Sequence, residues 1–264
     1  NELENIFYDF VNESIPSEIK SLLPKEKFWD NKKLEIVNPP VLRSLLKESG
    51  NKIDSIANII DSEFACLKDS LRLVVLVDRI GDGELLTVED IKKEGIRKLT
   101  AASVFIELTR RFISERISVA LVTGRLIVIP KSLKMKLKAF LSSNSKNSLE
   151  EEFSELKGYP DYFFISGPKK FWSDIVLGCT QCLIRGDLKV IVGTGSLLGE
   201  GWDCPSINSL ILGSQIGSFV ATNQMRGRAI RVDNNDAGKV SNIWHLATME
   251  TALDGGGYDF NVLK

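Results

Sequence analysis

The sequence predicts an α/β protein with a doubly wound, mainly parallel sheet, and two observations lead to this prediction. Short apolar runs of strand length recur along the chain, rich in valine, isoleucine and leucine, as in strands buried on both faces. Segments with apolar residues at helical spacing separate these runs, and such alternation is typical of βαβ units. The 264 residues suffice for one large domain, or for a domain with an extension.

About six strands are expected in the second part of the chain. They are the runs 71–77, 118–123, 162–166, 189–194, 209–214 and 241–247. The helices expected between them are 98–115, 132–143, 169–186 and 219–231. The polar tract 142–160 is expected to be a loop or a disordered insert. Ligands of such sheets bind at the carboxyl ends of the strands. The loops expected at that edge follow Val77, Thr123, Ser166, Thr194 and Ser214.

The first part of the chain has a different pattern. Short helical pieces broken by prolines are expected over 1–31, and a short strand is expected within 33–40. Further helices are expected over 41–49 and 54–70. We therefore expect a mostly helical extension or inter-domain linker over residues 1–51 and one domain over residues 52–264.

Composition narrows the class of protein. The net charge of −1 gives no overall basic character, so any nucleic-acid surface would be a local stripe. No run of about 18 apolar residues is present to span a membrane, and no signal peptide pattern begins the chain. Four cysteines are too few for a disulfide framework, which favours a reducing environment and a cytoplasmic location.

The stretch VIVGTGSLLGEGWDCPSINSLIL, residues 190–212, carries the first chemical signature. An expected strand ends at Thr194, and several glycines and then Asp203 follow before the next strand. Glycines let the backbone approach a ligand closely, and exposed N–H groups there bind phosphate. Asp203 is suited to accept hydrogen bonds from a sugar hydroxyl. The alternative is a glycine-rich turn with a structural role only.

The second signature is QMRGRAIR, residues 224–231, which has the pattern Gln-x-x-Gly-Arg-x-x-Arg. The simplest interpretation is a solvated basic helix face. Two features count against it, because the segment lies between two expected buried strands and contains Gly227. A glycine inside a helix costs about 1 kcal/mol relative to alanine. Close backbone packing or a bound phosphate would compensate for that cost.

Together the two stretches resemble motifs V and VI of superfamily 2 helicases (DEAD/DEAH-type), in their restriction and excision-repair-like form. The motif VI pattern falls on Gln224, Gly227, Arg228 and Arg231. The resemblance implies a RecA-like (P-loop NTPase-type) three-layer αβα domain, the C-terminal one of two. It also implies that Arg228 and Arg231 are catalytic arginine fingers. A planar, always charged guanidinium suits the γ-phosphate of ATP, where negative charge develops during phosphoryl transfer.

The resemblance implies two sets of binding residues. The nucleotide-binding set is Gly201 and Asp203, at the ribose, with Gln224 and Gly227. The nucleic-acid-binding set is Thr194, Gly195, Gly124 and Arg125. Met225 stands where DEAD-box proteins carry arginine, so the role of that arginine does not carry over to this chain, and Arg226 has no implied role. The run LRLVVLVD resembles motif IV, and DNA is the expected nucleic acid rather than RNA.

No Walker A sequence and no Asp-Glu pair after a buried strand are present in the chain. The resemblance therefore implies that ATP with Mg²⁺ is bound mainly by a missing N-terminal RecA-like domain of the same polypeptide. The isolated chain is expected to be inactive as an ATPase. One alternative is a RecA-like module that binds nucleic acid or a protein without ATPase activity. Another is a self-sufficient nucleotide-binding enzyme, which the lack of a lysine and of the dinucleotide glycine spacing in 193–201 disfavours.

Three lesser features have plain interpretations. Cys179 and Cys182 form a C-x-x-C within an expected helix, where core packing is favoured over zinc, and no metal site is expected. His245, the single histidine, is expected to be structural. The basic run of Lys131, Lys134, Lys136 and Lys138 is expected to be a solvated helix face. The alternative is contact with phosphates, on the expectation that the run begins near the carboxyl edge of the sheet.

Overall fold

The computed structural model describes residues 29–30, 33–34, 50–81, 98–112, 117–124, 126–144, 153–156, 158–165, 172–195, 202–214, 219–234 and 236–249. The chain divides into two compact units, Lys47–Thr248 and Asn1–Leu46 with Met249–Lys264. The second unit contains the antiparallel pair β1 (Trp29–Asp30) and β2 (Lys33–Leu34). The helical prediction is therefore wrong at β1, whereas β2 begins the predicted strand. The predicted helix over 41–49 lies outside the described residues, and the division at residues 51 and 52 stays a prediction.

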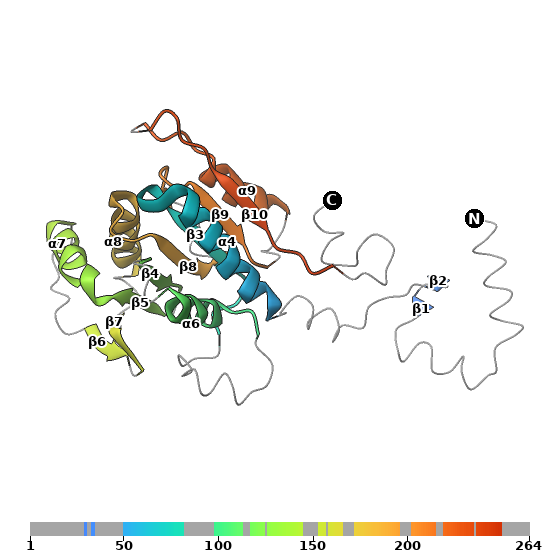
Figure 1. Cartoon of the computed structure of the whole chain (residues 1–264), viewed down its shortest axis with the longest axis horizontal. Helices are drawn as coiled ribbons and strands as arrows, with labels where there is room; N and C mark the ends of the chain where they lie inside the picture. Colours follow the sequence, from blue (N-terminus) through green and yellow to red (C-terminus); the bar gives the residue numbers. More distant parts are fainter. Residues whose placement is uncertain are drawn as a thin grey trace, which may run out of the picture. The chain divides into compact units, whose positions relative to one another are not determined.

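Eight strands form the sheet of the larger unit, in the spatial order β10-β9-β3-β8-β4-β5-β7-β6 (Figure 1). In chain order the strands are β3 (Leu73–Val77), β4 (Val119–Val122), β5 (Ile127–Pro130), β6 (Phe153–Leu156), β7 (Tyr159–Ile165), β8 (Val190–Thr194), β9 (Ser209–Leu212) and β10 (Asn242–His245). The strands from β10 to β4 pair parallel to one another. The remaining pairs, β4 with β5, β5 with β7 and β7 with β6, are antiparallel.

The six predicted strands correspond to β3, β4, β7, β8, β9 and β10, and all six run in one direction. The additional strand β5 runs the opposite way between β4 and β7, which makes both of those pairs antiparallel. The additional strand β6 lies inside the tract predicted to be a loop, so that prediction is wrong for Phe153–Leu156 and for the start of β7. The edge strand β6 is half-buried at its two ends and exposed at Ser154 and Glu155, and its polar composition resembles that of a loop.

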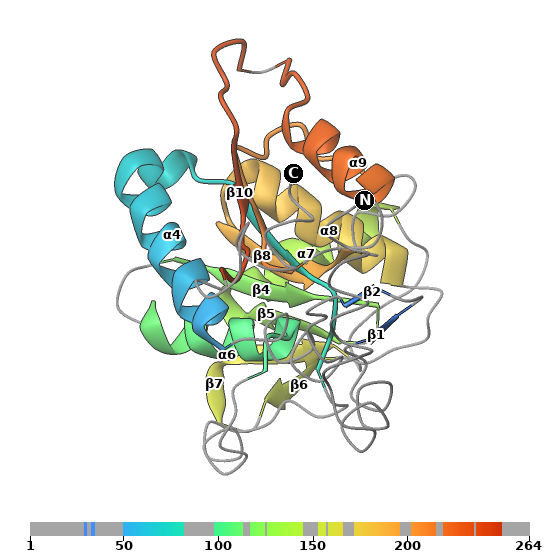
Figure 2. The ribbon, with the colours of Figure 1, turned by 90° about the vertical axis from the view of Figure 1, so that its right-hand side faces the viewer.

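Helices cover both faces of the sheet. On one face lie α4 (Asn51–Leu67) and α6 (Ala101–Arg111), and on the other lie α7 (Lys134–Asn144), α8 (Trp172–Arg185) and α9 (Phe219–Ala229). Figure 2 shows α4 and α8 on opposite sides of the strands. Successive strand residues point to opposite faces, and β3 divides in this way: Leu73, Val75 and Val77 join the α4–α6 core, whereas Val74 and Leu76 join the α7–α9 core. The helices and the sheet form three αβα layers, as predicted, and this arrangement is consistent with a RecA-like domain.

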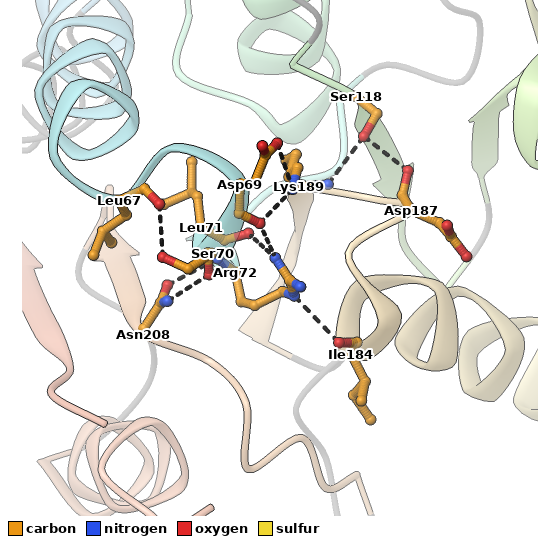
Figure 3. Close-up of polar contacts among 10 residues, drawn as sticks. All are labelled: Leu67, Asp69, Ser70, Leu71, Arg72, Ser118, Ile184, Asp187, Lys189 and Asn208. Carbon is orange, nitrogen blue, oxygen red and sulfur yellow. Dashed lines mark hydrogen bonds and ion pairs between the residues drawn. The ribbon is translucent and has the colours of Figure 1, made fainter. Parts of the chain in front are cut away.

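A polar cluster ties the amino ends of β3, β8 and β9 together (Figure 3). The Arg72 backbone N–H donates to Asn208 Oδ1 at 2.8 Å, and Arg72 Nε donates to the carbonyl oxygen of Ile184 at 3.3 Å. The Lys189 ammonium donates to the carbonyl oxygen of Asp69 and lies 3.5 Å from its carboxylate. Burial lowers the pKa of both Arg72 and Lys189. These contacts fix the edge of the sheet from which β9 starts.

Candidate functional site

The two predicted arginine fingers and Asp203 come together near the amino ends of β9 and β10. Arg231 Nη1 forms an ion pair with Asp203 Oδ1 at 2.6 Å, across 28 positions of the chain. Both side chains are about half exposed, at 49% and 52%. Arg228 Nη1 donates to the carbonyl oxygen of Trp202 at 2.5 Å. The motif V-like and motif VI-like stretches therefore meet at one place on the surface.

Trp202 anchors the segment that carries Asp203. Its indole is buried, and its Nε1 donates to Thr180 Oγ1 of α8 at 2.9 Å. Its carbonyl oxygen receives the Arg228 guanidinium from α9. Because the residue is held from two helices, the neighbouring Asp203 carboxylate has a defined position at the surface. Nothing in the residue pattern had singled out Trp202 for this role.

The turn that carries Arg231 is also braced. Lys239 Nζ donates to the carbonyl oxygens of Ala229 and Arg231 at 3.0 and 2.8 Å, and to that of Pro205. The last carbonyls of a helix have no partner within the helix, so a lysine is well suited to this position. Burial lowers the pKa of Lys239. One side chain thus joins the end of α9 to the segment that precedes β9.

Two of the other predicted nucleotide-binding residues, Gln224 and Gly227, are exposed on α9, and the third, Gly201, lies outside the described residues. A Cβ atom added at Gly227 would meet no heavy atom of the described residues within 4 Å, the backbone of α9 itself aside. Close packing within the described part of the chain therefore does not explain this glycine. The approach of a phosphate stays a prediction.

Three of the four predicted nucleic-acid-binding residues lie at the opposite edge of the sheet. Thr194 ends β8 beside Val77, the last residue of β3, and Gly195 follows it. Gly124 is exposed in the turn between β4 and β5, and Arg125 lies outside the described residues. At about 3.3 Å per strand residue, the two edges are roughly 15 Å apart. The carboxyl edge that the sequence pointed to therefore holds Thr194, Gly195 and Gly124, and the Asp203–Arg231 pair lies elsewhere.

Arg226, which had no predicted role, joins α9 to the edge strand. Its Nε donates to His245 Nε2 at 2.9 Å, and its Nη1 lies 3.3 Å from Asn223 Oδ1. Burial and the Arg226 charge lower the pKa of His245, which favours the neutral imidazole that can accept this hydrogen bond. His245 has the structural position in the last strand that was predicted for it.

The basic run and the cysteine pair can be placed as well. Because β5 runs antiparallel to β4, Lys131 follows the end of β5 at the amino edge of β4, and the expectation of the carboxyl edge is wrong. Cys179 and Cys182 lie in the core of the α7–α9 face, as predicted, and burial raises the pKa of both thiols. Within the described ranges, no group of three metal-ligating side chains is found. None of the helices described has the length and apolar character needed to cross a membrane.

Comparisons with known proteins found no matching family model and no matching curated protein. Among solved structures, the chain is similar to the Hef helicase domain of Pyrococcus furiosus, with 13% identity and a TM-score of 0.34 over 92% of this chain. This chain spans 34% of the Hef chain. It is also similar to the kinase domain of the Escherichia coli tyrosine kinase ETK, with 13% identity and a TM-score of 0.36, over 90% of this chain and 91% of that one. At TM-scores this low, neither similarity supports a function for this chain.

Proposed function

We propose that this chain is the C-terminal half of an ATP-dependent nucleic-acid helicase or translocase. In this proposal Arg228 and Arg231 act as arginine fingers toward ATP and Mg²⁺ held mainly by an N-terminal RecA-like domain. Asp203 binds the ribose, and the edge with Thr194 forms one side of a nucleic-acid groove. The protein works in the cytoplasm, on DNA rather than RNA.

The observation that supports the proposal is the meeting of Asp203, Arg228 and Arg231 at one surface. Two cationic side chains and one hydrogen-bond acceptor are the groups needed for the phosphates and the sugar of a nucleotide. ATP would supply a γ-phosphoryl group on which negative charge develops during transfer. The 49% exposure of the Arg231 side chain supports the proposal, because an exposed guanidinium is accessible to a phosphate of a bound nucleotide.

The chemistry at this surface is an exchange of partners. Asp203 now accepts from Arg231 at 2.6 Å. A ribose hydroxyl that donates to Asp203 would release the Arg231 guanidinium for a phosphate oxygen. Arg228 would keep one N–H on the Trp202 carbonyl oxygen and turn its other N–H groups toward a phosphate oxygen. In this proposal each of the three residues has a role in nucleotide binding that is compatible with its contacts in the structure.

A second candidate is a RecA-like module that binds nucleic acid or a protein without ATPase activity. The same contacts favour it, because both arginines already have partners inside the chain. The two candidates differ in what Arg231 does when nucleotide is present. In the second, Arg231 only stabilises the fold through Asp203.

The test is the nucleic-acid-stimulated ATPase rate of the full-length polypeptide. Arg231→Ala should lower this rate strongly while the protein stays folded, and the isolated chain should hydrolyse no ATP above background. Asp203→Asn, which removes the charge but keeps the shape, should raise the KM for ATP. An Arg231→Ala protein with an unchanged rate would favour the module without ATPase activity.

A further inference from the structure

Three lysines gather over two phenylalanine rings on the outer part of the sheet. Lys134 Nζ lies 4.5 Å from the centre of the Phe163 ring and 5.2 Å from that of Phe153. Lys131 lies 5.1 Å from Phe163, and Lys138 lies 5.8 Å from Phe153. We call these five residues the lysine–phenylalanine patch. It joins α7 and the turn before it to the β6–β7 hairpin.

The patch holds its lysines in defined positions. The Phe153 and Phe163 rings meet edge to face, with centroids 6.0 Å apart. Lys134 and Lys138 are half-buried, although lysine is a strongly hydrated residue that usually extends into water. Each ammonium over a ring is attracted by the negative face of the aromatic π-system. These side chains have therefore lost part of their rotational freedom before any partner binds.

The patch also concentrates positive charge on a chain whose net charge is −1. Among the residues that the structure describes, the Glu155 carboxylate pairs with Lys131 at 3.1 Å, and the Glu155 side chain is 82% exposed. The fourth lysine of the run, Lys136, points elsewhere and pairs with Asp187 at 2.5 Å. Three ammonium groups close together repel one another, and an anion with several charges would offset that repulsion.

We propose that the lysine–phenylalanine patch is a second nucleic-acid contact, which binds successive phosphates of a strand. Lys134 and Lys138 are one helical turn apart, so their Cα atoms are about 6 Å apart, comparable with the spacing of neighbouring phosphates. Ordering lysines before binding lowers the entropic cost of contact. The choice of a nucleic acid among polyanions rests on the proposed function. The position of the patch is independent of the proposed function, because the patch lies on the β5–β7–β6 side of the sheet, away from Thr194 on β8.

The test is a salt titration of binding by this chain to a fluorescent single-stranded oligothymidylate of about 20 nucleotides. Lys134→Ala/Lys138→Ala should reduce the slope of log K against log salt by about 1.4, if each lysine neutralises one phosphate. Lys134→Arg/Lys138→Arg should keep the slope. The matched control, Lys68→Ala/Lys98→Ala, removes the same charge from exposed positions next to α4 and α6 and should leave the slope unchanged.

Three results would overturn the proposal: no binding of the oligonucleotide, a slope that the alanine pair does not change, or an equal change in the control pair. Binding of anionic vesicles or of polyglutamate that depends on Lys134 and Lys138, without binding of the oligonucleotide, would also overturn the proposal. Circular dichroism of each variant checks the fold. Failure of the proposed ATPase role would appear in the Arg231 variant and not in this titration.

Discussion

The two predicted fingers differ in how much the fold depends on them, and this difference can be measured. Arg228 donates to the buried segment at Trp202, at 2.5 Å from its carbonyl oxygen. A hydrogen bond to a charged group contributes about 1.5–3 kcal/mol, and the partial exposure of Arg228 places the expected cost of Arg228→Ala near the lower value, about 1.5 kcal/mol. Arg231 makes a half-exposed ion pair, and such pairs contribute about 0.2–1 kcal/mol.

Each variant is unfolded in urea and, in a separate experiment, by heating. Circular dichroism monitors both transitions. For a unit of this size, 1 kcal/mol shifts Tm by about 2–4 °C. Arg228→Ala should therefore lower Tm by about 3–6 °C, and Arg231→Ala should lower it by at most about 4 °C. High salt should reduce the smaller effect further, because the Arg231–Asp203 pair is solvent-exposed. An Arg228→Ala cost equal to or below that of Arg231→Ala would refute the reasoning.

Three further predictions concern the fold around the site. Glu63→Ala removes a buried carboxylate that accepts hydrogen bonds from two side chains of β10. It should lower the free energy of unfolding, measured by urea denaturation, by about 1–3 kcal/mol. An unchanged free energy of unfolding would show that β10 is held without these bonds. Gly186→Ala should destabilise more than Gly158→Ala in the same assay. Both glycines have φ near +80°, which costs alanine about 1–2 kcal/mol, but only at Gly186 would the new Cβ meet the Arg72 guanidinium. Burial raises the pKa of three of the four thiols and keeps them protonated, so Ellman's reagent near pH 8 should modify Cys66 alone in the folded chain and every cysteine in urea.

The sequence predicted most of the sheet because its central strands are buried on both faces. The run Leu73–Val77 is apolar at every position, and such a run can be recognised as a buried strand from the sequence alone, without knowledge of the strands that pair with it. The strand β6, by contrast, is polar and exposed at both Ser154 and Glu155, so it contains no apolar run that would mark a strand. Its pairing with β7 depends on Phe153 and Phe163 meeting across the hairpin, which residue spacing along the chain does not reveal.

For the candidate site, the resemblance to motifs V and VI grouped Asp203 with Arg228 and Arg231, and these residues meet in the structure. It did not reveal their edge of the sheet, because that depends on where β9 and β10 begin. It also missed Trp202 and Lys239, whose contacts join segments far apart in the chain. These roles come from tertiary packing, and lone tryptophan or lysine residues carry no pattern that marks them.

The most direct test of the proposed function is the nucleic-acid-stimulated kcat of the full-length protein with Arg231→Ala and Arg231→Lys. Lysine keeps the charge but loses the planar, bidentate geometry. If Arg231 is a finger, the alanine variant should lose on the order of 10³-fold in kcat, and lysine should restore little of it. Nucleic-acid binding and Tm should stay close to those of the unaltered protein. A kcat within about twofold of normal for Arg231→Ala would contradict the proposal.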